Sequence, residues 1–211
     1  MNRVDLAWAI GRKTIHPLFA GLTRTKVYGK ENVPLEGGCV LACNHFSWVD
    51  PPVLGIASPR VVYFMAKIEA HRVPGLGALI RSFGTFSVRR GESDREAVRM
   101  MRQLVAEGKA LGIFAEGTRQ LSGVPGPVQP GAAMVAIQED VPVIPAAIYG
   151  SHEWRLGNFK RVSLEWGRPM RFDGLPKGGR GYKEASLLLQ EEIYRLWEGL
   201  SLRERPRQSH A

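Results

Sequence analysis

Cysteine is scarce in this chain: only Cys39 and Cys43 occur among its 211 residues. Two cysteines cannot form the disulfide framework that stabilises many small secreted domains. Both lie in a short apolar stretch that is typical of a buried strand, where a thiol behaves as a small hydrophobic side chain. The sequence therefore excludes a disulfide-rich fold and favours a reducing compartment.

Long hydrophobic runs are missing as well. The longest stretches without Lys, Arg, Asp or Glu are residues 37–49 and 120–138. The first is shorter than the roughly 20 apolar residues of a membrane-spanning helix, and a Gly- and Pro-rich loop at 122–127 interrupts the second. The apolar run 6–11 is too short for a signal peptide and follows an aspartate. We therefore expect a cytoplasmic protein without a membrane-spanning helix.

Signatures of several other protein classes are also absent. The sequence contains no Gly-x-Ser-x-Gly nucleophile motif, no Walker-type phosphate loop and no dinucleotide-binding fingerprint. His, Cys and carboxylate residues do not occur at the spacings of a metal site. No RNA- or DNA-binding motif accompanies the charged residues. We expect no metal, no cofactor and no nucleic-acid partner.

What the chain does have is an excess of positive charge. Lys and Arg number 29 against 20 Asp and Glu, which gives a formal net charge of +9. More than half of this excess lies in residues 1–30, which contain Arg3, Arg12, Lys13, Arg24, Lys26 and Lys30 against Asp5. Such a balance favours a polyanionic partner, for example an anionic membrane surface or a phosphorylated substrate. Solubility alone is the other explanation.

Residues 3–24 are predicted to form a basic amphipathic helical segment, which Pro17 kinks or splits. Its apolar side carries Trp8, Phe19 and Leu22, with basic residues between the apolar positions. This composition is typical of a helix that lies in a membrane interface. A helix packed on the protein's own core would show the same pattern, so both interpretations stay open.

After residue 26, short apolar stretches alternate with helical patterns. Strands are expected at 39–43, 61–65, 85–88, 111–115, 143–148 and 162–166, and helices at 51–57, 74–81, 93–108, 131–139 and 182–200. This alternation predicts an α/β fold with a mixed, largely parallel central sheet flanked by helices. We divide the chain into an N-terminal membrane-interface segment at 1–25, one domain at 26–203 and a disordered tail at 204–211.

Polar residues that could carry chemistry follow the strand at 39–43. His45 lies directly past this strand, and in an open α/β sheet ligands bind beyond the carboxyl ends of the strands. Asp50 precedes Pro51 and is expected to cap the helix that starts there. One carboxylate oxygen could cap the helix while the other accepts a hydrogen bond from the imidazole of His45. A bend between strand and helix is needed to bring the two side chains together.

A second polar group follows the strand at 111–115. Gly117 allows a sharp turn between Glu116 and Thr118, and Arg119 comes next, where its guanidinium could bind a phosphate through paired donors. A local ion pair between Glu116 and Arg119 that merely holds the turn is the alternative. Arg89 lies just past the strand at 85–88 and is a third candidate.

These pieces together resemble the four motif blocks of the glycerolipid acyltransferases, and most closely the 1-acylglycerol-3-phosphate acyltransferases. The matching blocks are Asn44-His45-x4-Asp50, residues 84–89, Phe114-Ala115-Glu116-Gly117-Thr118-Arg119 and residues 141–145. The resemblance implies that His45 and Asp50 are catalytic. It also implies that Arg89, Glu116, Gly117, Thr118 and Arg119 bind the phosphorylated glycerol of the acceptor.

The resemblance further implies a reaction and a location. An acyl group would pass from acyl-coenzyme A or acyl carrier protein to a lysophospholipid acceptor, 1-acylglycerol-3-phosphate, giving phosphatidic acid without a cofactor. The enzyme would be attached peripherally to the anionic surface of the cytoplasmic membrane. Another lysolipid acceptor, a thioesterase and a non-enzymatic binder of anionic membranes are the competing interpretations.

The chain departs from the family pattern at three places. Ala115 and Gln120 stand where many members have Pro and Ser on either side of the third block. Residues 128–131 stand where many members have Phe-Lys-x-Gly. The missing lysine removes one phosphate contact, so the acceptor headgroup is less well defined than the reaction.

Overall fold

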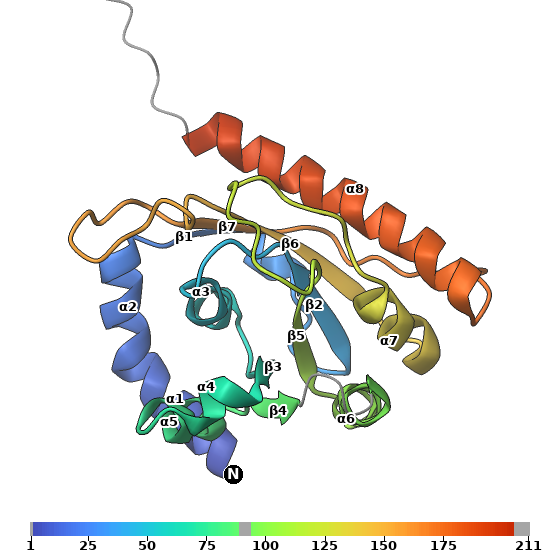
Figure 1. Ribbon diagram of the computed structural model, residues 1–211, viewed down its shortest axis with the longest axis horizontal. Coiled ribbons are helices and arrows are strands. Elements are labelled where there is room, and N and C mark those ends of the chain that lie inside the picture. The colour runs from blue at the N-terminus through green and yellow to red at the C-terminus, as the bar shows by residue number, and fades with distance from the viewer. Residues whose placement is uncertain (1, 89–93, 205–211) are drawn as a thin grey trace, which may run out of the picture.

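A single mixed sheet organises the chain, and the computed structural model describes residues 2–88 and 94–204. The seven strands lie in the order β1-β7-β6-β2-β5-β3-β4 (Figure 1). Their bounds are β1 (Lys26–Tyr28), β2 (Cys39–Cys43), β3 (Val62–Lys67), β4 (Phe86–Val88), β5 (Ala110–Phe114), β6 (Val143–Tyr149) and β7 (Ser163–Trp166). All neighbouring strands pair in parallel except β6 and β7, which are antiparallel. This confirms the expected largely parallel sheet.

The helices occupy both faces of the sheet. They are α1 (Arg3–Lys13), α2 (Ile15–Thr23), α3 (Asp50–Ala57), α4 (Ile68–Arg72), α5 (Leu76–Ser82), α6 (Asp94–Ala106), α7 (Gly131–Glu139) and α8 (Gly179–Glu204), with a 3₁₀ turn η1 (Lys30–Asn32). The sequence missed β1, η1 and α4, because elements of three to five residues are too short to show a period. Residue 93, the expected first residue of the helix at 93–108, lies outside the described residues.

Strand β2 at the centre of the sheet shows how the two faces are separated. Cys39, Leu41 and Cys43 pack into one apolar cluster with Trp8 of α1 and with α3, and Val40 and Ala42 into a second with α6, α7 and α8. Side chains alternate between the faces of a strand, so a strand buried on both faces has no polar position. All five residues of β2 are buried.

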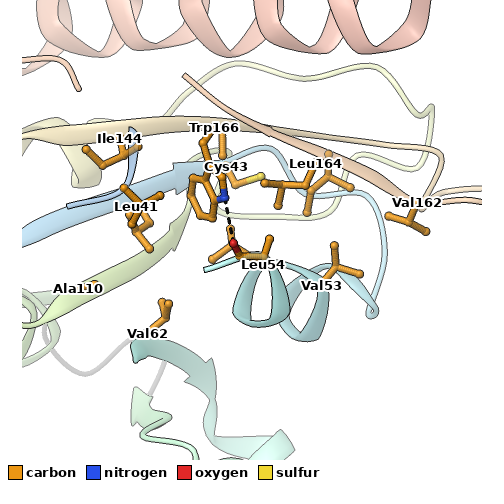
Figure 2. Close-up of a cluster of buried hydrophobic side chains, with 14 of the residues drawn as sticks. Leu41, Cys43, Val53, Leu54, Val62, Ala110, Ile144, Val162, Leu164 and Trp166 are labelled. Carbon is orange, nitrogen blue, oxygen red and sulfur yellow. Dashed lines mark hydrogen bonds between the residues drawn. The ribbon is translucent and has the colours of Figure 1, made fainter. Parts of the chain in front are cut away.

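The first of these clusters fixes α3 in place. Leu41, Ile144 and Leu164 from three strands face Val53 and Leu54 of α3 (Figure 2). The indole N–H of Trp166, which is buried, donates a hydrogen bond to the Ala57 carbonyl at 3.3 Å. Because both the body and the end of α3 are held against the sheet, its first residue, Asp50, is held beside the end of β2.

The expected N-terminal helical segment is split, and the break lies at Thr14 between α1 and α2. Pro17 is the third residue of α2, within the first turn, where backbone N–H groups have no partner in the helix. Trp8 is only 3% exposed, and its indole N–H donates to the Phe83 carbonyl at 3.0 Å. Phe19 is partly buried against the same core.

Leu22 also packs against this core, so assigning Trp8, Phe19 and Leu22 to an interfacial side was wrong. The alternative of a packed helix holds for these three residues. A different apolar set on the two helices faces outward: Leu6, Ile10, Ile15 and Leu18 are all more than 40% exposed. No helix in residues 2–88 and 94–204 combines the length and apolar character needed to cross a membrane.

The C-terminal helix α8 is longer than expected and runs from Gly179 to Glu204. Glu204, assigned to the disordered tail from the sequence, is its last residue and accepts a hydrogen bond from the Tyr28 hydroxyl at 2.8 Å. It also pairs with Arg161 at 3.3 Å. These partners lie far away in the sequence, which explains why the composition of the tail did not reveal this anchor. The rest of the expected tail, 205–211, lies outside the described residues.

Candidate active site

His45 and Asp50 meet at the carboxyl end of β2, as their position in the sequence predicts. The imidazole Nδ1 of His45 lies 2.9 Å from Oδ2 of Asp50. The Asp50 side chain is fully buried, and the His45 side chain is 17% exposed. The strand ends at Cys43 and α3 begins at Asp50, so the intervening loop supplies the bend that the pair requires.

Asp50 does not cap α3, which corrects the sequence-based expectation. Its Oδ2 atom accepts hydrogen bonds from the backbone N–H groups of Phe46 at 2.6 Å and Ser47 at 2.7 Å, both in the loop before the helix. The residues after Asp50 explain the difference. A cap at Asp50 would accept from the N–H of residue 52 or 53; Pro52 has none, and the Val53 N–H donates instead to the Val49 carbonyl at 3.0 Å. The carboxylate therefore organises the loop that carries His45.

The Asp50 contact also sets the protonation pattern of the imidazole. A carboxylate can only accept, so Nδ1 of His45 carries the hydrogen in this pair, and a neutral ring then has its lone pair on Nε2. The ring stacks on Phe114 with centroids 4.1 Å apart and planes 23° apart. No residue in the described part of the chain hydrogen-bonds to Nε2. The imidazole thus has a fixed orientation, and its Nε2 is not engaged by the described residues.

Asn44 joins the end of β2 to β6. Its amide nitrogen donates to the Ile148 carbonyl at 3.0 Å, and its amide oxygen accepts from the Ile148 N–H at 2.7 Å. The residue is fully buried. The sequence alone assigned no role to Asn44. Its position directly after an entirely apolar strand was the available signal, because a buried polar side chain needs partners.

Glu116 points into the protein. It is 4% exposed, and its Oε2 atom accepts from the N–H of His45 at 2.8 Å while Oε1 accepts from the N–H of Gly126 at 2.7 Å. Within residues 2–88 and 94–204 it forms no ion pair with Arg119, so the proposed local ion pair is wrong. Glu116 instead ties the His45 loop to the segment around Gly126.

Burial of Glu116 raises the pKa of its carboxyl to about 7. Desolvation is the main cause, because the charged form loses contact with water. The hydrogen bonds from the N–H groups of Gly126 and His45 oppose this shift. The negative charge of Asp50 raises the pKa by a smaller amount. Two carboxyl groups thus flank His45, one bonded to its side chain and the other to its backbone.

The part of the third motif after Glu116 is exposed. Gly117 adopts a positive φ of 71°, which confirms the turn expected there, and Thr118 and Arg119 lie at the surface beyond it. The N–H of Gln120 donates to the His45 carbonyl at 2.7 Å, so this turn runs alongside the His45 loop. Arg89 lies outside the described residues. Among residues 2–88 and 94–204, no three His, Cys, Asp or Glu side chains converge as metal ligands.

Fold and site together define an α/β protein with an imidazole–carboxylate pair at the carboxyl edge of its sheet. Residues 24–149 match the acyltransferase family, and the chain belongs to this family. It is 36% identical over 126 residues to a 1-acyl-sn-glycerol-3-phosphate acyltransferase of Bacillus subtilis, a match that covers 59% of this chain and 62% of the relative. It is also similar to a lyso-ornithine lipid O-acyltransferase of Pseudomonas aeruginosa, with 40% identity over 79 residues, covering 36% of this chain and 29% of the relative.

The fold is that of a solved acyltransferase. The crystal structure of the 1-acyl-sn-glycerophosphate acyltransferase from Thermotoga maritima has a TM-score of 0.72 and 24% sequence identity, covering 95% of this chain and 84% of that one. The sequence matches to curated relatives cover a smaller share of each relative than this structural match does. They cover 62%, 40% and 54% of the Bacillus subtilis, Brassica napus and Borreliella burgdorferi 1-acyl-sn-glycerol-3-phosphate acyltransferases.

The buried position of Glu116 generates a prediction about stability and pH. The folded-state pKa of about 7 lies above the ordinary glutamate value of 4.5, so the native state binds this proton more tightly than the unfolded chain does. The contribution of Glu116 is then complete at pH 4.5 and below, and is lost as pH rises towards 7. We expect wild type to lose about 1–3 kcal/mol of stability relative to Glu116→Gln across this window. Urea unfolding at several pH values measures the difference.

An exposed glutamate supplies the control for this experiment. Glu36→Gln removes the same charge at the surface, and its stability difference from wild type should stay nearly constant over the same pH range. If the Glu116→Gln difference were equally flat, the carboxyl of Glu116 would not be perturbed by its burial.

Proposed function

We propose that this chain is an acyl-thioester-dependent 1-acylglycerol-3-phosphate acyltransferase that forms phosphatidic acid in phospholipid biosynthesis. The observation that carries the proposal is the hydrogen-bonded pair of His45 and Asp50 at the sheet edge of a member of the acyltransferase family. The Bacillus subtilis relative, whose name states this activity, supports the choice of reaction. The donor is acyl-coenzyme A or acyl carrier protein, and no cofactor takes part.

In the proposed mechanism, His45 acts as a general base. Its Nε2 atom takes the proton from the acceptor hydroxyl while the hydroxyl oxygen attacks the thioester carbonyl. The carbon–oxygen ester bond forms, the tetrahedral intermediate collapses, and the carbon–sulfur bond breaks. The imidazolium returns its proton to the departing thiolate. Asp50 stabilises the imidazolium and holds its orientation, as the aspartate does in a catalytic triad, with the substrate hydroxyl in place of serine.

Arg119 and, from the sequence, Arg89 are proposed to bind the acceptor phosphate, with Gly117 and Thr118 in the same loop. Arg119 is exposed in the turn beside His45, and a guanidinium offers paired donors to a phosphate. Glu116 takes a different part in the proposal: it positions the loop through backbone contacts. The similarity to a lyso-ornithine lipid O-acyltransferase favours a second candidate acceptor that lacks a phosphate.

We also propose that the chain attaches peripherally to anionic membranes through α1 and α2. Leu6 and Ile10 lie four residues apart on α1, and Leu18 extends the apolar surface onto α2. Exposed basic residues of the same segment include Arg3 and Lys13. Apolar side chains that enter the acyl boundary, together with cations near lipid headgroups, are the features of an interfacial helix.

The reaction is tested by measuring acyl-thioester consumption with and without lysophosphatidate. We expect consumption only with the acceptor present, and a loss on the order of 10²–10⁴-fold in His45→Ala. Asp50→Asn should also lose activity, because the amide keeps an oxygen for the loop but no charge for the imidazolium. A thioesterase would consume the donor without acceptor, and a non-enzymatic binder would consume none. Near wild-type turnover by a folded His45→Ala protein would contradict the mechanism.

The phosphate contact is tested with two acceptors. Arg119→Ala should raise the apparent KM for lysophosphatidate about tenfold or more, with a smaller effect on kcat, because the contact forms on binding and persists in the transition state. Arg119→Lys should rescue only in part, since an ammonium lacks the planar two-donor fork. The apparent KM for lyso-ornithine lipid should not change with either substitution. Equal losses with both acceptors would mean that Arg119 acts only on the loop.

Membrane attachment is tested by sedimentation with phosphatidylglycerol vesicles. Ile10→Glu/Leu18→Glu should lower partitioning about tenfold or more, because two exposed apolar side chains no longer enter the bilayer. Leu187→Glu/Leu202→Glu is the matched control, since both leucines are exposed on α8 and the charge change is the same. Equal vesicle binding by the two variants would contradict the proposal that α1 and α2 contact the membrane.

A further inference from the structure

A groove between α6 and α7 lies on the sheet face opposite α1 and α2. Its volume is about 660 Å³. Arg95, Arg99 and Arg102 line it from α6, at spacings of four and three residues that place them along one side of the helix. Val98 and Met134 supply apolar lining from the two helices. The groove is separate from His45 and Asp50 and has no part in the mechanism above.

The groove keeps a positive charge after its internal pairing is taken into account. Arg102 forms an ion pair with Glu139 of α7. Arg95 and Arg99 are exposed and form no ion pair with a carboxylate of residues 2–86 or 95–204. Two exposed guanidiniums thus lie beside the apolar lining.

The size of the groove indicates the kind of ligand. Small-molecule and cofactor sites typically enclose about 300–1,000 Å³ and combine apolar lining with a few charged groups. A protein partner instead needs a broad surface of about 800 Å² on each side. The groove therefore fits a compact phosphate-bearing molecule better than a folded carrier protein.

The topology connects the groove to the sheet edge that carries His45. Strands β4, β3, β5 and β2 are neighbours and run parallel, so their carboxyl ends lie at one edge. Helix α6 follows β4 in the chain (Figure 1). Arg95 is the second residue of this helix. Arg102 lies about 10 Å further along at 1.5 Å per residue. The groove thus leads away from the site edge along α6.

We infer that the groove between α6 and α7 binds the nucleotide end of a coenzyme A thioester. Arg95 and Arg99 donate hydrogen bonds to its phosphates, and the acyl end extends across the sheet edge towards His45. This inference rests on the proposed function, which supplies the thioester donor. The outward apolar side chains of α1 and α2 lie on the other face, so a water-soluble donor reaches the groove from the aqueous side.

The first test measures binding of free coenzyme A to the full chain by calorimetry. Arg95→Ala/Arg99→Ala should weaken binding about tenfold or more, because charge-assisted hydrogen bonds to phosphate are lost. Arg195→Ala/Arg203→Ala is the matched control and removes two charges from exposed arginines of α8. Arg102 is left unchanged so that its pair with Glu139 survives. Circular dichroism confirms folding of both variants. Equal coenzyme A binding by the two double variants overturns the inference.

The second test separates the donor classes and the two proposals. The groove variant should have a raised KM for acyl-coenzyme A and an unchanged KM for an S-acyl pantetheine, which lacks the nucleotide phosphates. A loss confined to acyl carrier protein would assign the groove to that protein and overturn the inference. Arginine-dependent coenzyme A binding by a chain that transfers no acyl group would support the groove and contradict the proposed reaction. Acyl transfer by a chain whose coenzyme A binding does not depend on Arg95 and Arg99 would support the proposed reaction and overturn the inference about the groove.

Discussion

The geometry of the candidate site depends on one oxygen atom, Oδ2 of Asp50. It accepts hydrogen bonds from the imidazole of His45 and from the backbone N–H groups of Phe46 and Ser47. A fully buried carboxylate is costly unless several donors compensate for lost water, and here all three come from the preceding loop. The second oxygen, Oδ1, is buried without a hydrogen-bond partner among residues 2–88 and 94–204. The interaction that orients the imidazole therefore also folds the loop that carries it.

The backbone of this loop is held to the strands on either side of β2. Asn44 forms two hydrogen bonds with Ile148 of β6, and Glu116, directly beyond β5, accepts from the N–H of His45. The N–H of Gln120 adds a further bond to the His45 carbonyl. His45 is thus fixed at its side chain, its N–H and its carbonyl. A general base gains most when its direction is set before the substrate binds, so this network suits the proposed reaction.

The two faces of the sheet differ in a way that suits two substrates of unlike solubility. One face carries α1 and α2, whose exposed side chains include an apolar set, and the other carries the arginine-lined groove between α6 and α7. In the function we propose, a lipid acceptor and a water-soluble thioester would approach from opposite faces. They would meet at the edge where the strands end. The central sheet separates the approaches and still brings both to His45.

Much of the architecture could be predicted from the chain alone. Apolar runs of strand length alternating with helical patterns determine an α/β fold, and parallel strands place their carboxyl ends at one edge. His45 and Glu116 follow two such strands, so their proximity was predictable. The turn at Gly117 was predictable, because a glycine between a strand and polar residues allows a sharp turn. Its positive φ is a backbone conformation that a residue with a side chain would adopt only with strain.

Only the tertiary structure decided where several side chains point. Trp8 turns inward because Phe83, 75 residues away, offers a carbonyl to its indole, and the helical pattern alone fits either orientation. Glu116 turns inward because the N–H groups of His45 and Gly126 converge on it. Asp50 organises the loop before α3 because Pro52 has no N–H to cap and the Val53 N–H is bonded to the Val49 carbonyl. The sequence by itself determined which residues gather at the sheet edge, because strands that alternate with helices run parallel and end at the same edge. Their roles depended on donors and acceptors that only the folded chain brings together.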